Sequence, residues 1–110
     1  SSKDNEFIKH IKKLKDKKST EYAIMEFPLK NKHIYTPFQA ELKKGEWIDF
    51  REACGRIAKS YLYLYPPGIP FLVPGEIISE EVIGFTEECK AKGLEIKGMD
   101  KGQLEVVANE

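Results

Sequence analysis

Residues 65–76 read Tyr65-Pro66-Pro67-Gly68-Ile69-Pro70-Phe71-Leu72-Val73-Pro74-Gly75-Glu76, and this stretch holds four of the six prolines of the 110-residue chain. Each proline fixes its own φ at about −65° and biases the residue before it towards extended geometry. Gly68 and Gly75 are the expected positions of positive φ, and Val73 to Glu76 has the sequence of a type II turn. We therefore expect a stiff, extended, apolar segment that holds one shape.

Two further elements precede this segment. Thr36-Pro37-Phe38-Gln39 has the sequence of a helix start, because threonine caps a helix, proline suits its first position, and Gln39 completes a capping box. Glu52-Ala53-Cys54-Gly55-Arg56-Ile57 lies closer to the proline segment. In this order and spacing, the three elements resemble the C-terminal domain of the bacterial ornithine/lysine/arginine decarboxylases, from Tyr35 to Val107. Residues 1–34 show no such resemblance.

The resemblance implies a larger parent enzyme, of which this chain is a fragment. Enzymes of this family use pyridoxal phosphate on a fold-type-I scaffold and convert a basic amino acid into a polyamine precursor and carbon dioxide. This domain would support the subunit and border the active-site entrance, with the large pyridoxal-phosphate-binding domain of the same chain as its partner, in a homo-oligomer. The motif residues assigned to that entrance or interface are Arg56, Tyr65, Pro66, Pro67, Gly68, Pro70, Pro74, Gly75 and Glu76.

No catalytic, cofactor-binding or metal-binding residue is assigned in this chain. The family supplies its Schiff-base lysine from a Ser-x-His-Lys stretch, and the sequence has no His-Lys dipeptide. It also has no glycine-rich loop leading into a helix, which would cradle a phosphate. We expect the fragment alone to be inactive and without cofactor. The alternative is a non-catalytic binding or assembly module that shares this domain, or a parent that has lost its lysine. The choice among ornithine, lysine and arginine as substrate stays open.

The composition is that of one globular domain. Eighteen basic and eighteen acidic residues cancel and 41% of the residues are hydrophobic, so no nucleic acid or anionic membrane is expected as a partner. No apolar run is long enough to cross a bilayer and no signal-peptide pattern opens the chain, so the cytoplasm is the default compartment. Residues 1–34, a helix with a connecting segment, and residues 35–110, the decarboxylase-type domain, are expected to form one compact unit.

The cysteines and histidines give no sign of a metal site or a catalytic pair. Cys54 and Cys89 lack the spacing of a zinc site and are interpreted as two buried thiols, with a disulfide left open. His10 and His33 each stand beside a lysine, and no third group is placed to orient a Cys–His pair.

Apolar periodicity and turn residues predict an α+β fold with three to four helices, short strands and a hairpin. A helix is expected over Asp4–Lys17, whose lysines are interpreted as a solvated face in preference to a nucleic-acid or membrane patch. A linker over residues 17–20 and a short strand over residues 21–27 follow. The capped helix that begins at Thr36 is expected to end near Gly45.

The middle of the chain predicts an extended piece at Trp47 and Ile48, then a short helix capped at Asp49 that ends at Gly55. Residues 58–65 alternate as a strand. One face of this strand carries Ala58, Ser60, Leu62 and Leu64, and the other carries Lys59, Tyr61, Tyr63 and Tyr65. The tyrosine face either packs beneath the domain's own helices or meets the larger domain of the parent.

The last third predicts a strand over Ile69–Val73 and a helix that is capped by Ser79 and ends at Gly93. Gly84 inside this helix suggests close packing at that point. The buried stripe of the helix is expected to consist of Val82, Phe85 and Cys89. Leu94–Lys97 and Gln103–Val107 are predicted to pair as a hairpin.

Arg51 and Arg56 are the only arginines in the chain, and a planar guanidinium suits a partly buried carboxylate. We predict that Arg56 pairs with Glu76 as a structural ion pair. Alternatively, Glu76 faces the mouth of the parent's active site, where it would attract the distal cation of a basic amino acid.

Two other patterns receive weaker interpretations. Pro67 to Pro70 fits the PxxP pattern of SH3-type ligands but lacks a flanking basic residue. The acidic pairs at residues 80–81 and 87–88 are interpreted as helix surface and not as metal ligands.

Overall fold

The computed structural model describes residues 6, 8–9, 29–65 and 68–109. Residues 6 and 8–9 are helical, and the rest of the helix expected over Asp4–Lys17 lies outside the described residues, as do the linker and strand expected over residues 17–27. Pro66 and Pro67 also lie outside them. Ile8 belongs to the hydrophobic core, where its side chain is fully buried.

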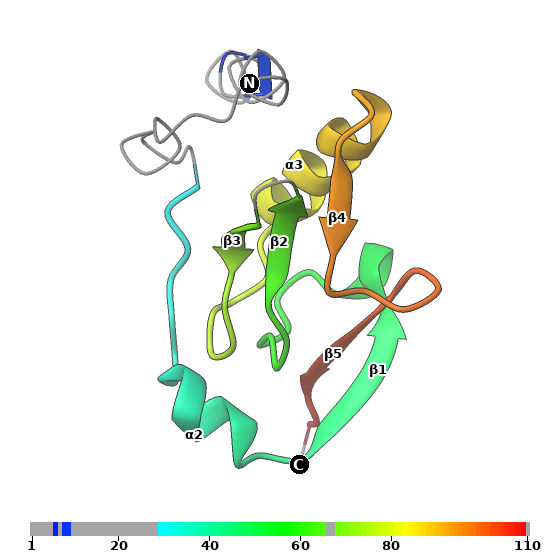
Figure 1. Ribbon diagram of the computed structural model, residues 1–110. Coiled ribbons are helices and arrows are strands. Elements are labelled where there is room, and N and C mark those ends of the chain that lie inside the picture. The colour runs from blue at the N-terminus through cyan, green and yellow to red at the C-terminus, as the bar shows by residue number, and fades with distance from the viewer. Residues whose placement is uncertain (1–5, 7, 10–28, 66–67, 110) are drawn as a thin grey trace.

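Two small antiparallel sheets form the β part of the fold (Figure 1). In one, β1 (Gly45–Asp49) pairs with β5 (Gln103–Val107), so that Trp47 lies opposite Glu105. In the other, β2 (Leu62–Tyr65) lies between β3 (Ile69–Leu72) and β4 (Glu95–Lys97). The strand predicted over residues 69–73 and the extended piece at Trp47 and Ile48 are confirmed.

The predicted hairpin between residues 94–97 and 103–107 is wrong, because β4 pairs with β2 and β5 pairs with β1. The connecting turn is closed only by Asp100 and Gln103, whose backbone groups exchange hydrogen bonds of 3.0 and 2.9 Å. Gly98, with φ of 122°, lies so close to the carbonyl of Tyr61 that a side chain would overlap it. β4 therefore belongs to the β3-β2-β4 sheet, and the chain continues through the turn into β5 of the β1-β5 sheet.

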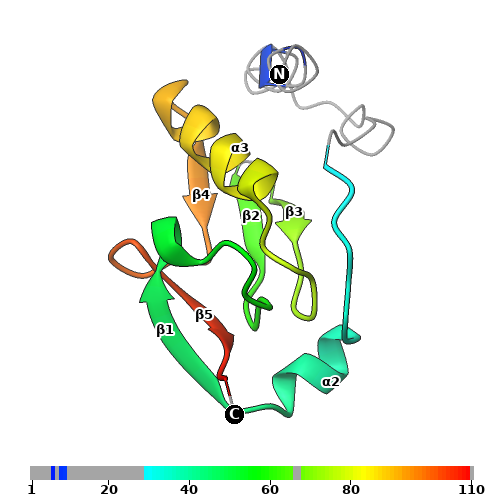
Figure 2. The ribbon, with the colours of Figure 1, turned by 180° about the vertical axis from the view of Figure 1, so that it is seen from behind.

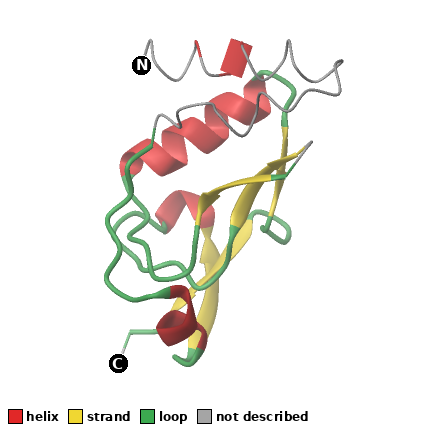
Figure 3. Cartoon of the chain, turned by 60° about the vertical axis from the view of Figure 1, so that its left-hand side comes forward, coloured by secondary structure: helices red, strands yellow, loops and turns green. Residues whose placement is uncertain are grey.

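Helix α3 (Glu80–Ala91) covers one face of the β3-β2-β4 sheet (Figures 2 and 3). Ser79 caps it by accepting from the Val82 amide at 3.2 Å, and the helix ends before Gly93, which has φ of 84°. The Phe85 ring meets Phe71 of β3 edge-on, with centroids 5.3 Å apart. The predicted stripe of Val82, Phe85 and Cys89 is buried, together with Thr86.

Gly84 is an exception among the predictions for α3. It is exposed, and a side chain placed there would meet nothing within 4 Å. The close packing expected at this position is therefore wrong. Gly84 stands on the solvent side of a helix whose opposite side carries the contact with the sheet.

Helix α2 (Pro37–Glu41) begins with the predicted capping box. The Thr36 hydroxyl accepts from the Gln39 amide at 3.1 Å, and the Gln39 side chain accepts from the Thr36 amide at 2.9 Å. The helix is capped at Leu42, so it is shorter than the expected run to Gly45.

The helix predicted from Asp49 is a single 3-10 turn, η2 (Phe50–Glu52), in which the Asp49 carboxylate accepts from the Arg51 amide at 2.8 Å. Residues 29–65 and 68–109 thus hold two α-helices and one 3-10 turn in place of the three to four helices predicted. The α+β class is confirmed.

The strand predicted over residues 58–65 is regular only from Leu62, because the chain bends at Ser60. Leu62 and Leu64 point into the core, as their alternation predicted. On the other face, the half-buried rings of Tyr61 and Tyr63 stack with their centroids 5.7 Å apart.

The core lies between α3, the two sheets and the 3-10 turn. Its buried members are Ile8, Phe50, Ala53, Ala58, Leu62, Leu64, Phe71, Leu72, Ile78, Val82, Phe85, Cys89, Leu94, Leu104 and Val106.

Candidate functional site

The Val73–Glu76 segment forms the predicted type II turn. The Glu76 amide donates to the Val73 carbonyl at 3.2 Å, Pro74 is buried, and Gly75 has φ of 96°. The Glu76 carboxylate folds back, so that its Oε1 accepts from the Val73 amide at 2.8 Å. The glutamate of the Pro-Gly-Glu motif therefore closes the turn with its own side chain.

Asn31 fastens this turn to the end of β3. Its side-chain Nδ2 donates to Glu76 Oε1 at 3.1 Å and to the Phe71 carbonyl at 2.8 Å. Glu76 is half-buried and accepts two hydrogen bonds on one carboxylate oxygen. Its side chain is consequently held in a fixed position within this domain.

The turn also pairs with the segment that leads into α2. The Gly75 carbonyl accepts from the amides of Ile34 at 2.8 Å and Tyr35 at 3.2 Å, and the Ile77 amide donates to the Lys32 carbonyl at 2.8 Å. A side chain at Gly75 would overlap the carbonyl of Tyr35. Only glycine fits here, because the position combines positive φ with direct backbone contact.

On its other side, the turn pairs with residues 55–58. The Gly75 amide donates to the Ala58 carbonyl at 2.8 Å, and the Ala58 amide donates to the Glu76 carbonyl at 2.9 Å. Further along, the Ile78 amide donates to the Arg56 carbonyl at 2.9 Å. Residues 32–35 and residues 55–58 thus flank the proline-glycine turn on opposite sides.

Residues 57–59 pair in turn with β5. The Val107 amide donates to the Ile57 carbonyl at 2.8 Å, and the Lys59 amide donates to the Glu105 carbonyl at 3.0 Å. Four segments therefore lie side by side in a backbone ladder, which consists of residues 32–35, 75–78, 55–59 and 105–107. The elements around Thr36, Arg56 and Pro74 that stood apart in the sequence are brought together by this ladder.

Arg56 binds Glu46 of β1 and not Glu76, so the predicted Arg56–Glu76 pair is wrong. Its Nη2 lies 2.9 Å from Glu46 Oε2 and 3.0 Å from the Val107 carbonyl. Glu46 shares the half-buried face of β1 with Ile48. A carboxylate on the inward face of a strand is the sequence signal that could have identified it as the partner.

The hydrogen bond from Arg56 lowers the pKa of the Glu46 carboxyl below its ordinary value, because it favours the ionised form. The backbone amide of Asn109, 3.4 Å from Glu46 Oε2, acts in the same direction. Arg56 is thereby fixed at the junction of β1 and β5.

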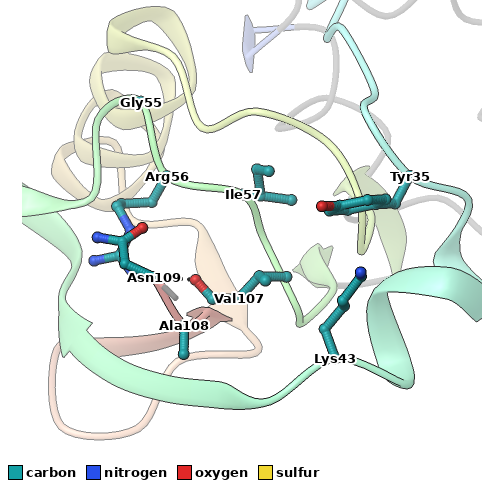
Figure 4. A pocket seen from close by; sticks show the side chains of 8 residues that line it. All are labelled: Tyr35, Lys43, Gly55, Arg56, Ile57, Val107, Ala108 and Asn109. Carbon is teal, nitrogen blue, oxygen red and sulfur yellow. Dashed lines mark hydrogen bonds between the residues drawn. The ribbon is translucent and has the colours of Figure 1, made fainter.

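A cavity of about 240 Å³ opens beside this ion pair (Figure 4). Tyr35 and Lys43 stand on one side of it and Arg56 and Asn109 on the other, and the Lys43 ammonium lies 4.9 Å from the centre of the Tyr35 ring. The complete lining is Tyr35, Lys43, Gly55, Arg56, Ile57, Val107, Ala108 and Asn109. Arg56 and Lys43 are the cationic side chains of this lining, and the charge of Arg56 is already paired with Glu46. Of its lining, only Arg56 was predicted as a site residue.

A second groove, of about 170 Å³, runs between the proline turn and the start of α2. Glu76 lines it, and the remaining members are His33, Tyr35, Thr36, Pro37, Val73 and Pro74. Pro74, Gly75 and Glu76 thus lie at one end of the domain, beside α2.

The described residues of the first half of the proline segment lie elsewhere: Tyr65 ends β2, Pro70 belongs to β3, and Gly68 lies between the two strands. Gly68 has the predicted positive φ, 101°, and its amide donates to the Leu64 carbonyl at 2.9 Å. Tyr65 is 47% exposed and Pro70 is exposed. The motif residues therefore divide between two places in the fold.

The remaining polar candidates that the structure describes do not assemble into a site, and His10 lies outside the described residues. Cys54 is exposed and Cys89 is buried, so the expectation of two buried thiols is wrong for Cys54. His33 is exposed. Among the described residues, no three His, Cys, Asp or Glu side chains are placed to hold a metal ion. Nor does any helix in that part of the chain have the length and apolarity needed to cross a membrane.

Fold and ladder together define a compact α+β domain. The chain belongs to the family of the Orn/Lys/Arg decarboxylase C-terminal domain, which matches residues 13–107. The match begins well before Tyr35, where the resemblance in the motifs starts.

Arginine and lysine decarboxylases are among the relatives of this chain. Arginine decarboxylase of Bacillus subtilis is 38% identical over 88 residues, which are 80% of this chain and 17% of that protein. The inducible lysine decarboxylase of Escherichia coli is 44% identical over 48 residues, 43% of this chain and 7% of that one. This chain therefore spans less than a fifth of the length of these relatives.

Solved structures show the same fold. The constitutive lysine decarboxylase of Escherichia coli superposes with a TM-score of 0.63 and 28% identity, covering 74% of this chain and 14% of that one. The lysine decarboxylase of Francisella novicida gives a TM-score of 0.62 at 24% identity, over 73% and 14% of the two chains, and supports the fold alone.

Replacing Gly75 with alanine is expected to lower the free energy of unfolding by about 2–5 kcal/mol, because positive φ and overlap with the Tyr35 carbonyl both penalise a side chain. Gly55→Ala is the matched control, since Gly55 has φ of 85° and nothing within 4 Å of an added Cβ. It should cost only about 1–2 kcal/mol. Urea unfolding of both variants measures the difference, and equal losses would contradict the constraint at Gly75.

The Glu46–Arg56 pair should make stability depend on pH on the acid side. Because the folded pKa of Glu46 is lowered, its contribution is present above the ordinary carboxyl pKa of 4.5 and is lost as pH falls through the folded value. We expect wild type to exceed Glu46→Gln in stability at neutral pH and the gap to close on acidification. Thermal unfolding of both proteins across this range measures the gap, and a gap independent of pH would exclude ionisation of Glu46 as its origin.

Proposed function

We propose that this domain is the C-terminal accessory part of a pyridoxal-phosphate-dependent decarboxylase of ornithine, lysine or arginine. The observation that carries the proposal is the family match over residues 13–107. It is supported by the similarity to named decarboxylases, in which the matched region is a small part of the whole chain. The parent is proposed to act in the cytoplasm as a homo-oligomer, with its large cofactor-binding domain as the neighbour of this one.

The residues of this chain do not fit the cofactor. A pyridoxal phosphate enzyme needs a Schiff-base lysine and a phosphate cradle, and the sequence has neither a His-Lys dipeptide nor a glycine-rich loop at a helix start. The cofactor, which supplies an electron sink for loss of carbon dioxide when bound, is therefore assigned to the remainder of the parent. This domain contributes a rigid surface.

That surface is proposed to border the active-site entrance at Glu76. The carboxylate of Glu76 lines the groove between the proline turn and α2, and two hydrogen bonds to one of its oxygens hold it in place. A fixed negative charge at an entrance raises the local concentration of a cationic substrate. This supports a role for Glu76 in attracting the distal cation of a basic amino acid.

The proposed function is tested on the full-length parent. The purified protein should show the visible absorbance of bound pyridoxal phosphate, lose it after borohydride reduction, and release carbon dioxide from at least one of ornithine, lysine and arginine. A colourless protein without decarboxylase activity would favour a non-catalytic binding or assembly module that shares this domain.

The entrance role makes a separate prediction for Glu76→Gln in the full-length enzyme. The amide keeps the shape and an oxygen acceptor for the turn but removes the charge, so KM for the basic substrate should rise roughly threefold to tenfold with kcat unchanged. The increase should shrink at high salt. Glu87→Gln on the exposed side of α3 is the control and should leave KM unaltered. An unchanged KM in Glu76→Gln would remove the entrance role.

A further inference from the structure

Helix α2 and its C-cap residue present two large apolar side chains to solvent. Phe38 is 69% exposed and Leu42 is 73% exposed, and residues four apart lie on the same face of a helix. Ala40 is the only buried residue of α2. The helix therefore turns its small side chain inward and its large ones outward, which reverses the usual arrangement of a surface helix.

The exposed face is held in a fixed position. A helix of five residues has no stability of its own, yet α2 is fastened at both ends. The capping box of Thr36 and Gln39 closes its start, and the Lys59 ammonium donates to the Glu41 carbonyl at 3.0 Å at its end. The residues before it are bound to the Gly75 carbonyl in the backbone ladder. Phe38 and Leu42 are thus ordered in advance for contact with another surface.

The position of α2 in the fold leaves this face clear of the described core. Figures 1 and 2 show α2 at the end of the domain opposite α3, level with the start of β1. Neither Phe38 nor Leu42 belongs to the core cluster or to the residues packed against it. Rigid, adjacent, exposed apolar side chains of this kind mark interaction sites.

We propose that Phe38 and Leu42 insert into an apolar socket on the remaining part of the same decarboxylase polypeptide. The proposal rests on the proposed function, in which this domain is attached to a much larger catalytic part. The domain covers only 17% of an arginine decarboxylase and 14% of a lysine decarboxylase, so most of such a polypeptide is available to supply the socket.

The size of the face favours a tethered partner over a second copy of the chain. Two side chains bury only a few hundred Å², whereas stable association of separate proteins buries roughly 1,200–2,000 Å². A partner on the same polypeptide meets the face at a high effective concentration, so a small contact is sufficient. Lys43 and Lys44 follow Leu42 directly, and an acidic rim on the socket would complement them.

Hydroxyl-radical footprinting of the wild-type full-length parent tests the contact directly. Phe38 and Leu42 should be modified at least about tenfold more slowly than in the same protein unfolded by guanidinium. Side chains left 69% and 73% exposed would instead react within about twofold to threefold of the unfolded rate, and that result would overturn the proposal. Loss of protection on dilution of the oligomer would also overturn it, because a second copy would then be the occupant.

A double variant, Phe38→Ser with Leu42→Ser, tests whether the contact holds the domain in place. In the full-length protein, proteolytic release of the domain should accelerate at least about tenfold. Glu41→Gln changes an exposed side chain of the same helix and should leave the rate unchanged. Equal rates in the double variant and wild type would contradict the proposal, and if the double variant does not fold, the wild-type footprint decides alone.

The two proposals can fail separately. A parent with no cofactor absorbance and no decarboxylase activity, but with Phe38 protected, would refute the proposed function and support the docking contact. An active decarboxylase in which Phe38 reacts as a solvent-exposed ring would refute the docking contact and leave the function standing.

Discussion

The constraint on which the rest of this domain depends is the close backbone contact at Gly75. Its carbonyl accepts the amides of Ile34 and Tyr35, its amide donates to Ala58, and no side chain can be placed between it and Tyr35. Both backbone polar groups of Gly75 join segments distant in sequence. Glycine is required there because two backbones approach where a Cβ would stand.

From this contact the organisation of the domain follows in both directions. Towards the N-terminus, the ladder orders residues 32–35 and so fixes α2 and its exposed face. Towards the C-terminus, it passes through residues 55–59 to β5 and β1, where Arg56 adds an ion pair to Glu46. The Pro-Gly-Glu motif is thus explained first as a structural joint. If Glu76 also acts on a substrate, it does so with a carboxylate whose position is already fixed by hydrogen bonds from Val73 and Asn31.

Features set by neighbouring residues were predictable from the sequence. The Thr36 capping box, the Ser79 cap and the Val73–Glu76 turn each depend on the chemistry of a few adjacent residues, and all three are confirmed. The alternation of Leu62 and Leu64 correctly identified the buried face of β2, since strand geometry fixes which side chains share a face.

Features set by distant residues were not predictable in the same way. Residues 94–97 and 103–107 follow one another closely in sequence and were expected to pair. Instead, β4 pairs with β2 and β5 pairs with β1. The sequence offers many carboxylates as partners for Arg56. Glu46 becomes the partner because β1 pairs with β5 in the folded chain. The exposed face of α2 escaped notice because Phe38 and Leu42, read alone, are ordinary core residues.

The central place of β5 has a consequence for how the polypeptide is made. Residues 103–107 lie inside the arrangement, between β1 on one side and residues 57–59 on the other, yet the ribosome adds them after every other strand. While the nascent chain lacks them, Ile48 and Ala58 are without the residues of β5 that they face, Leu104 and Val106. Val107 must therefore leave the exit tunnel before β1 and residues 57–59 can be joined through β5, which makes closure of this domain a late event in its synthesis.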